Sequence, residues 1–195
     1  MKITKEKAEE NRVALVAAAA RLFREKGVDG VGVAEISKVA GLTHGALYAH
    51  FPSKEALAVE AMKLGKDQAK SKLMEGNRDG EPDLEAFVAY YLAPEQRDNY
   101  AESCALAAAA SEIGRHEAAL SAVSTESFLN TINAFEKRLV ANQPQLNARP
   151  QAMALMASLI GAMAMARATV KSHPEVSAQI LEGAHQLVSD ALNKR

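Results

Sequence analysis

Polar side chains gather between residues 43 and 54, away from the apolar positions of this segment. The set consists of Thr43, His44, Tyr48, His50 and Lys54. Their hydroxyl, imidazole, phenol and ammonium groups can donate hydrogen bonds to phosphate oxygens and to base edges. Whether these groups form one surface depends on the elements that carry them.

The residues around this set predict two short helices joined by a tight turn. Val33, Ile36 and Ala40 recur at helical spacing and give the first helix one apolar face. Gly41 supplies the positive φ that a sharp turn between helices needs, because a residue with a Cβ resists that conformation. Thr43 then stands where an N-cap would begin the second helix. This pattern is typical of a helix-turn-helix that enters the major groove of DNA.

Apolar residues on the far side of the turn complete the core of this small domain. They are Leu42, Leu47 and Phe51, and they leave the polar set off the buried face. For two polar residues a packing role stays open. Tyr48 could lie on the adjacent helix, and the His50 ring could cap the core.

The run Gly-Leu-Thr-His-Gly-Ala-Leu-Tyr-Ala-His-Phe-Pro-Ser-Lys-Glu at 41–55 resembles the DNA-binding helix-turn-helix of TetR-family transcriptional regulators. The specific part of this match is the string Leu-Tyr-x-His-Phe-x-Ser-Lys at 47–54. A looser likeness to one branch of the family lies in Arg-Asp-Asn at 97–99 and Cys-Ala-Leu-Ala-Ala at 104–108. The resemblance therefore extends over nearly the whole chain.

The resemblance implies how the polar set would bind DNA. Thr43 and His44 would meet base edges or nearby phosphates. Tyr48 and His50 would meet the sugar-phosphate backbone, and Lys54 would add a charge at a helix N-terminus, where phosphate is favoured.

Two glycines affect the expected DNA contacts. Gly45 would let the recognition helix approach the groove closely. In the loop before the helix-turn-helix, where many relatives carry Thr or Ser, this chain has Val31 and Gly32. A side-chain phosphate contact is therefore not expected from that loop.

Composition predicts an all-α protein. Of 195 residues, 48% are apolar and only 5% aromatic, and no convincing period-two pattern is present. Residues 1–54 contain nine Lys or Arg and six acids, whereas the remainder contains 14 basic and 18 acidic residues. A basic N-terminal part favours phosphate contact at one end, and ordinary scatter of surface charge could also give an excess of this size.

We expect two domains. Residues 1–55 are assigned to a three-helix DNA-binding domain, and residues 56–195 to a helical domain for which the resemblance implies ligand binding and dimerisation. The first helix is expected over about 4–26, with an apolar stripe at Val13, Val16, Ala17, Ala20 and Phe23. Further helices are expected over about 53–75, 83–92, 103–114, 116–141, 150–172 and 174–193, with a loop at 76–82.

The last two expected helices carry apolar faces that would form a four-helix interface with a second copy of the chain. Candidate interface residues are Leu159, Met163, Ile180, Ala184, Leu187 and Val188. One of these faces could instead belong to the protomer core. Two DNA-binding domains (residues 1–55, called the heads below) held rigidly in a homodimer would span a palindromic site on double-stranded DNA.

A pocket for a small-molecule effector is implied by the resemblance. Large apolar or amphipathic residues on the central helices, together with one cysteine, are candidates for its wall: Phe87, Tyr90, Tyr91, Cys104, Phe128 and Met156. Each aromatic or methionine candidate is more often a plain core residue than part of a pocket wall.

Cys104 is the single cysteine, so an internal disulfide is excluded and a reducing cytosol is favoured. It lies near the expected start of a short helix, where the positive end of the helix dipole favours a reactive thiolate. One hypothesis is a sensor of oxidants or electrophiles. The other is a small side chain whose sulfur does not react.

Several classes of function are not expected. The sequence contains no catalytic constellation, no phosphate-binding glycine loop and no nucleophile elbow, so we predict no enzyme and no cofactor. His116-Glu117 lacks a second histidine at zinc-binding spacing, and no metal site is predicted. The chain begins without an apolar signal core, and the apolar stretch 152–166 is too short to span a bilayer. We expect a cytoplasmic protein without membrane contact.

Taken together, these features predict a homodimeric transcriptional regulator. Its simplest form is a repressor that a small-molecule inducer releases from a palindromic operator. The alternative is a cytosolic α-helical module that binds a ligand, or senses electrophiles or oxidants through Cys104, and has no operator.

Overall fold

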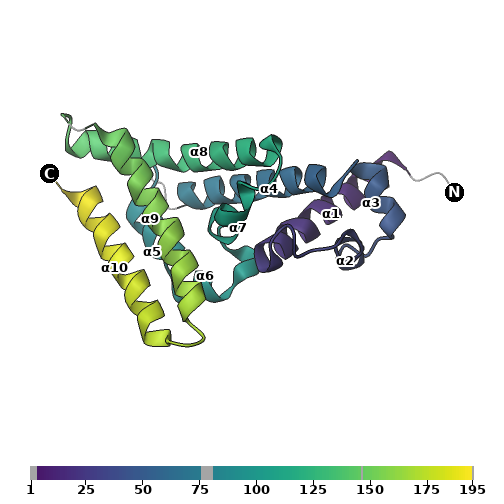
Figure 1. Cartoon of the computed structure of the whole chain (residues 1–195). Coiled ribbons are helices and arrows are strands. Elements are labelled where there is room, and N and C mark those ends of the chain that lie inside the picture. Colours follow the sequence, from purple (N-terminus) through teal and green to yellow (C-terminus); the bar gives the residue numbers. More distant parts are fainter. Residues whose placement is uncertain (1–3, 76–80, 146, 195) are drawn as a thin grey trace. The chain divides into compact units, whose positions relative to one another are not determined.

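A computed structural model of the chain describes residues 4–75, 81–145 and 147–194. Within these ranges the chain is helical and contains no β-strand, which confirms the expected all-α class (Figure 1). The elements are α1 (Lys5–Lys26), α2 (Val33–Val39), α3 (His44–His50), α4 (Lys54–Met74), α5 (Leu84–Tyr91), α6 (Pro94–Asp98), a 3-10 helix η1 (Tyr100–Glu102), α7 (Ala105–Ile113), α8 (Ala118–Asn142), α9 (Ala148–Thr169) and α10 (Pro174–Asn193).

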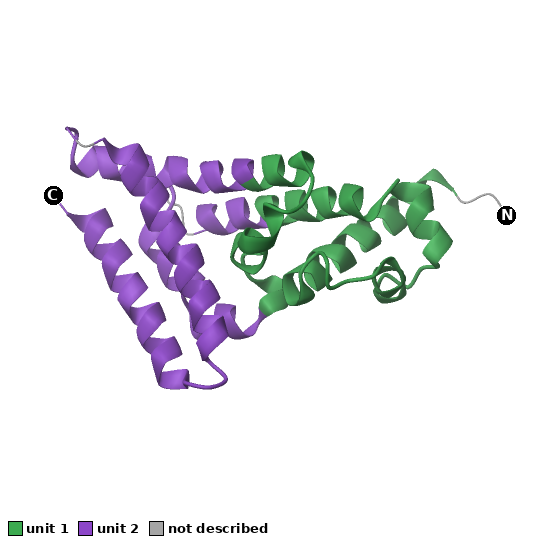
Figure 2. Cartoon of the chain, viewed as in Figure 1, with its two compact units in different colours: residues 1–67, 100–124 green, residues 68–99, 125–195 purple. Residues whose placement is uncertain are grey.

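Two compact units divide the chain (Figure 2). Unit 1 contains residues 1–67 and 100–124, and unit 2 contains residues 68–99 and 125–195. Helices α4 and α8 each begin in unit 1 and end in unit 2. The functional boundary after residue 55 stays a prediction.

Helix α1 forms the centre of unit 1 and contacts α2, α3, η1 and α7. Its N-cap is Thr4, whose hydroxyl accepts the Lys7 N–H at 3.2 Å. The predicted apolar stripe is wrong at two positions, since Val13 is 57% exposed and Ala17 is also exposed. The buried face centres on Leu15 instead. Alanines lie on several faces of α1, so apolar periodicity alone does not fix which face is buried.

Unit 2 is built on the antiparallel contact between α9 and α10, with α5 and α6 packed against them. Its core is made of large side chains that are almost fully buried: Phe87, Ile132, Phe135, Leu139, Met156, Leu159, Met163 and Leu192. A buried arginine joins the helices. Arg167 of α9 donates from Nη2 to the Gln96 carbonyl at 2.8 Å and from Nε to the Arg97 carbonyl at 3.2 Å, near the C-terminal end of α6.

Helix α9 is longer than the apolar stretch that the sequence suggested. With 22 residues and a mean hydropathy of 1.4, it is long and apolar enough to cross a membrane by length and composition alone. The short length of the apolar stretch at 152–166 is therefore no argument against a membrane span. Packing argues against such a span, because Leu159, Met163 and Ala166 are buried within unit 2 and Arg167 is held there by backbone carbonyls.

Several element boundaries differ from the predictions. The N-cap of α7 is Cys104, while the Ser103 hydroxyl donates back to the Tyr100 carbonyl. Pro94 opens α6, and α9 begins at Ala148, so that Pro150 lies in its first turn. Proline fits the first turn of a helix because no intrahelical partner is lost there. The loop predicted at 76–82 falls largely outside the described residues.

Candidate nucleic-acid interface

The turn between α2 and α3 is closed by a complete pair of backbone hydrogen bonds. Leu42 donates its N–H to the Ser37 carbonyl at 2.8 Å, and Gly41 donates to the Lys38 carbonyl at 3.1 Å. Gly41 adopts φ +70, as this type of helix ending requires. The turn therefore has the geometry that the sequence predicts, and it fixes the angle at which α3 leaves α2.

Helix α3 is held by one apolar anchor and one cap. Leu47 is fully buried, and the Thr43 hydroxyl accepts the Ala46 N–H at 3.3 Å. The opposite face, with His44, Gly45 and Tyr48, is exposed. A short helix with a buried inner side and a polar outer side is the form that enters a major groove.

His44 and Tyr48 lie together on the outer face, one turn apart. Their ring centroids are 5.2 Å apart and the planes are tilted by 60°. Tyr48 is 50% exposed, so the packing alternative does not describe its position. The space beside Gly45 is open, because a Cβ added there would meet no atom within 4 Å. A groove wall can therefore approach the backbone of α3 at this point.

His50 lies at the edge of this surface rather than on its outer face. It is half-buried, and its ring centroid is 6.5 Å from that of the buried Phe51. It also lines an open groove of about 420 Å³ in unit 1, together with Arg12 and His116. The Arg12 guanidinium lies 5.3 Å from the centroid of the Phe51 ring. His50 combines the packing role and an exposed edge.

Lys54 has a structural partner that the sequence did not suggest. Its ammonium donates to the Val28 carbonyl at 3.0 Å and lies 3.4 Å from the Val31 carbonyl. This holds the loop between α1 and α2 against the start of α4. The first residues of α4 are ordered by Ser53, whose hydroxyl accepts the Ala56 N–H at 3.1 Å.

Charged residues of the head also form local ion pairs. Lys26 pairs with Glu35 at 2.5 Å, which raises the pKa of this lysine through the hydrogen bond and the carboxylate charge. Lys38, in the last turn of α2, is exposed near the turn. Lys38 is not among the residues predicted to contact DNA, and its position two residues before the turn is the sequence signal that makes it a phosphate-contact candidate.

The residues predicted for a ligand pocket separate into the two units. Phe87 and Tyr91 are buried in unit 2 with ring centroids 5.9 Å apart, and Phe87 meets Phe135 edge-on at 6.3 Å. Met156 is only 2% exposed. The Lys72 ammonium lies over the half-buried ring of Tyr90 at 4.6 Å, and Phe128 is also half-buried.

Cys104, the sixth candidate, belongs to unit 1 and has Arg24 of α1 in its surroundings. Cys104 is half-buried at the N-cap of α7. Burial lowers the pKa of Arg24, and the charges of Glu102 and Cys104 partly oppose that shift. No Lys, Arg or His adjoins Cys104 in the sequence. The cation near it in the fold is Arg24, which lies 80 residues earlier in the chain.

The residues predicted for a dimer interface fall into two groups in unit 2. Leu159, Met163 and Val188 are at most 1% exposed, so within this protomer they pack in its own core. Leu187 is 56% exposed, and Ile180 and Ala184 are partly exposed.

Comparison with known proteins divides the chain into two matched regions. Residues 15–61 match the family of bacterial regulatory proteins known as the tetR family. Residues 83–179 match the C-terminal domain of LmrA/YxaF-like transcriptional regulators.

Curated relatives match shorter parts of the chain. Residues of this chain are 43% identical over 61 positions to the HTH-type transcriptional regulator AcrR of Shigella flexneri, covering 31% of this chain and 28% of AcrR. They are 37% identical over 83 positions to the HTH-type transcriptional regulator LmrA of Bacillus subtilis (strain 168), covering 40% of this chain and 44% of LmrA. The matches thus span less than half of each relative.

Solved structures share the fold over nearly the full chain. A TetR-family transcriptional regulator from Agrobacterium tumefaciens has a TM-score of 0.77 at 22% identity, covering 92% of this chain and 98% of the other. The reduced form of E. coli NemR has a TM-score of 0.75 at 22% identity, covering 92% and 95%. At this level of identity the likeness concerns the fold.

Proposed function

Because the chain belongs to the TetR family of bacterial regulatory proteins, we propose that it is a sequence-specific DNA-binding transcriptional regulator and not an enzyme. The observation that carries the proposal is the outer face of α3. His44, Gly45 and Tyr48 are exposed there on a helix whose inner side is anchored by Leu47. This arrangement leaves donors free for base edges and phosphates.

The six predicted DNA contacts divide by role. Thr43, His44 and Tyr48 meet DNA directly, and Gly45 permits the close approach. His50 contributes from the edge of the surface. Lys54 acts chiefly by holding the loop before α2, since its ammonium bonds to the Val28 carbonyl, and its charge adds to the local attraction for phosphate.

We propose a homodimer that binds a palindromic operator. One head reads few base pairs, and two heads held at a fixed spacing read successive major grooves. Support for the interface comes from apolar residues on α9 and α10, namely the exposed Met165 and Leu187 and the partly exposed Ile180 and Ala184. Leu159, Met163 and Val188 serve this interface from within, by fixing α9 against α10.

We further propose that the regulator is a repressor and that a small-molecule effector releases it from the operator. Helix α4 is continuous from unit 1, which carries the head, into unit 2. An effector bound in unit 2 would shift α4 and change the spacing of the two heads. Such coupling is commonly worth about 1–3 kcal/mol, and it requires that the effector bind the two states with different affinity.

A second candidate function is chemical sensing by Cys104, and one observation favours it. Cys104 is half-buried at the N-cap of α7 and lies near Arg24 of α1. Reaction with a thiol probe at neutral pH tests this hypothesis. A folded protein whose Cys104 stays unmodified contradicts it. In either function we place the protein in the cytoplasm, where its DNA target lies.

The test is binding of the purified protein to fragments of its own genome at two salt concentrations. Specific retention of a palindromic fragment is expected, with log affinity falling by about 0.9 per log unit of salt for each phosphate neutralised. His44→Ala and Tyr48→Phe should each weaken retention without changing the unfolding curve. The matched control is His173→Ala, an exposed histidine between α9 and α10.

Two results would count against this function. One is weak binding that is equal for all fragments. The other is equal loss of retention in His44→Ala and His173→Ala, because a histidine of unit 2 has no place in the proposed DNA surface.

A further inference from the structure

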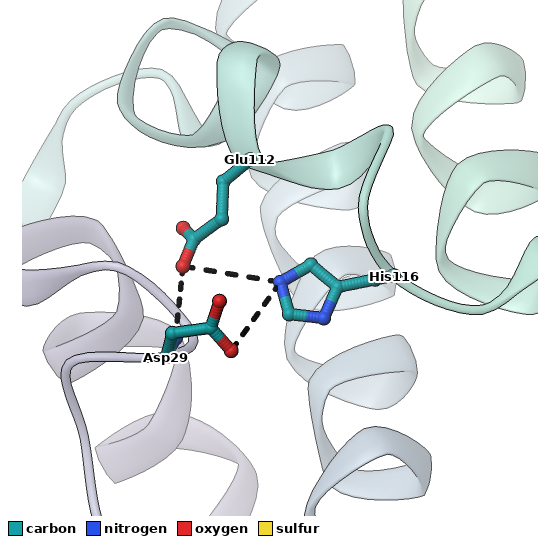
Figure 3. Close-up of side chains that lie close together, drawn as sticks. All are labelled: Asp29, Glu112 and His116. Atoms are coloured by element: carbon teal, nitrogen blue, oxygen red, sulfur yellow. Dashed lines mark hydrogen bonds and ion pairs between the residues drawn. The ribbon is translucent and has the colours of Figure 1, made fainter.

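Three potential metal ligands meet within unit 1, where Glu112 and His116, four residues apart, come together with the distant Asp29 (Figure 3). Asp29 lies in the loop between α1 and α2, Glu112 in the last turn of α7, and His116 in the turn before α8. Each offers one ligand atom, and these atoms all lie within 4.8 Å of one another. The cluster lies outside the α3 surface and outside the core of unit 2.

His116 directs a buried ring nitrogen into this cluster. Its side chain is 11% exposed, and its Nε2 atom is buried without a hydrogen-bond partner in the described part of the chain. Asp29 Oδ1 and Glu112 Oε1 each lie 3.8 Å from Nε2, which is too far for a hydrogen bond. A buried polar atom of this kind costs free energy unless a further group satisfies it.

The Glu112 carboxylate is already oriented by the backbone of the facing loop. Val28 donates its N–H to Oε2 at 3.0 Å, and Asp29 donates its N–H to Oε1 at 2.8 Å. Each carboxylate oxygen keeps a further lone pair. Outer contacts of this kind hold a ligand in place before an ion arrives, which is how metal sites are commonly supported.

We propose that Asp29, Glu112 and His116 bind a divalent transition-metal ion of the Zn²⁺ type. The 3.8 Å separations are slightly less than twice a Zn–N or Zn–O bond of about 2.0–2.2 Å, so that one ion reaches both atoms of each pair. An imidazole with two carboxylates suits such ions, whereas Mg²⁺ prefers oxygen ligands and its own waters. Water completes the coordination.

The surroundings of the cluster allow an ion to enter and give its binding a physical consequence. His116 also lines the open groove of about 420 Å³, which is a path for the ion and its waters. The bound ion ties the loop that leads into α2 to the end of α7. Since the unfolded chain lacks this arrangement, the ion stabilises the folded state in proportion to its affinity and concentration.

The test is isothermal titration of the full-length chain with zinc chloride alone, in a Cys104→Ser background that removes the one thiol able to bind zinc by itself. Saturable binding of one ion per chain is expected. His116→Gln and Asp29→Asn should each weaken the affinity at least tenfold, and His173→Ala should leave it unchanged. Mg²⁺ at the same concentration should not displace the zinc.

The Asp29 variant keeps the result interpretable. The Asp29 side chain is 67% exposed, so Asp29→Asn is expected to fold, and its far-UV circular dichroism checks this. The proposal is overturned if the Cys104→Ser chain shows no saturable zinc binding. It is equally overturned if His116→Gln and Asp29→Asn bind zinc as tightly as their parent.

Discussion

Gly41 and Gly45 offer the same chemical change, glycine to alanine, at two positions of the helix-turn-helix that differ only in backbone conformation. At both positions an added Cβ would meet no atom within 4 Å, so steric crowding by neighbours contributes nothing. Gly41 adopts φ +70, whereas Gly45 is an ordinary helical residue near the start of α3. The two substitutions therefore isolate the backbone contribution.

The expected effects have opposite signs. Alanine at Gly41 must adopt a left-handed conformation, which costs roughly 1–2 kcal/mol because its Cβ crowds the following carbonyl. Alanine at Gly45 keeps a favourable conformation and reduces the freedom of the unfolded chain, which stabilises by about 0.4–1 kcal/mol. Gly41→Ala should lower the urea midpoint and Gly45→Ala should raise it slightly, while the m-value stays constant.

DNA binding adds a second readout to this pair. The Gly45→Ala methyl group would project from the exposed face of α3, so affinity for the operator should fall although the protein is more stable. An unchanged urea midpoint in Gly41→Ala would refute the argument from the left-handed turn. Equal destabilisation by both substitutions would refute it as well, because only Gly41 has positive φ.

Three further substitutions test other contacts by chemical denaturation. Glu60→Gln weakens the link between α4 and α1, because Glu60 accepts from Lys63 and from Arg12, the latter at 2.5 Å, and both hydrogen bonds lower the pKa of this carboxyl. Because the pKa of Glu60 is lower in the folded state, its stabilising contribution is present above about pH 4.5 and is lost as the pH falls through the folded pKa. We therefore expect Glu60→Gln to lower the free energy of unfolding by about 0.5–1 kcal/mol at pH 7 and to have no effect in acid. A difference in stability that is independent of pH would contradict this. Arg167→Met removes the side-chain donor of two carbonyls in unit 2 and should cost about 2–4 kcal/mol, so a measured loss below 1 kcal/mol would count against this role of Arg167. Lys54→Met should cost about 1–2 kcal/mol without any DNA present, whereas a loss confined to DNA affinity would show that its charge acts only on phosphate.

Helix caps and turns are predictable from the sequence because the interacting groups are only a few residues apart. Thr43 caps α3 and Thr4 caps α1 because each hydroxyl reaches an N–H three residues ahead. Gly41 has positive φ because the chain must reverse at that point. These features depend on residues a few positions apart, and the sequence therefore predicts them directly.

Features that depend on distant residues were not predictable in this way. The partner of Lys54 is a carbonyl 26 residues earlier, and Glu112 binds amides more than 80 residues earlier. Glu112 and His116 are four residues apart, but the sequence gives no sign that Asp29, 83 residues before Glu112, lies beside them. The spacing rules applied to His116-Glu117 therefore cannot test a cluster that includes Asp29.

The residues of α9 and α10 show why apolar periodicity alone cannot separate a core from an interface. Leu159 and Met163 stand at a helical spacing on α9, as do Ala184 and Leu187 on α10, and only the packing of α9 on α10 distinguishes the buried pair from the more exposed one. A dimer would bury the second pair against another copy by the same hydrophobic effect that buries the first. Truncation to alanine should therefore separate them, since loss of Leu159 leaves a cavity inside the protomer, whereas loss of Leu187 lowers only the affinity between copies.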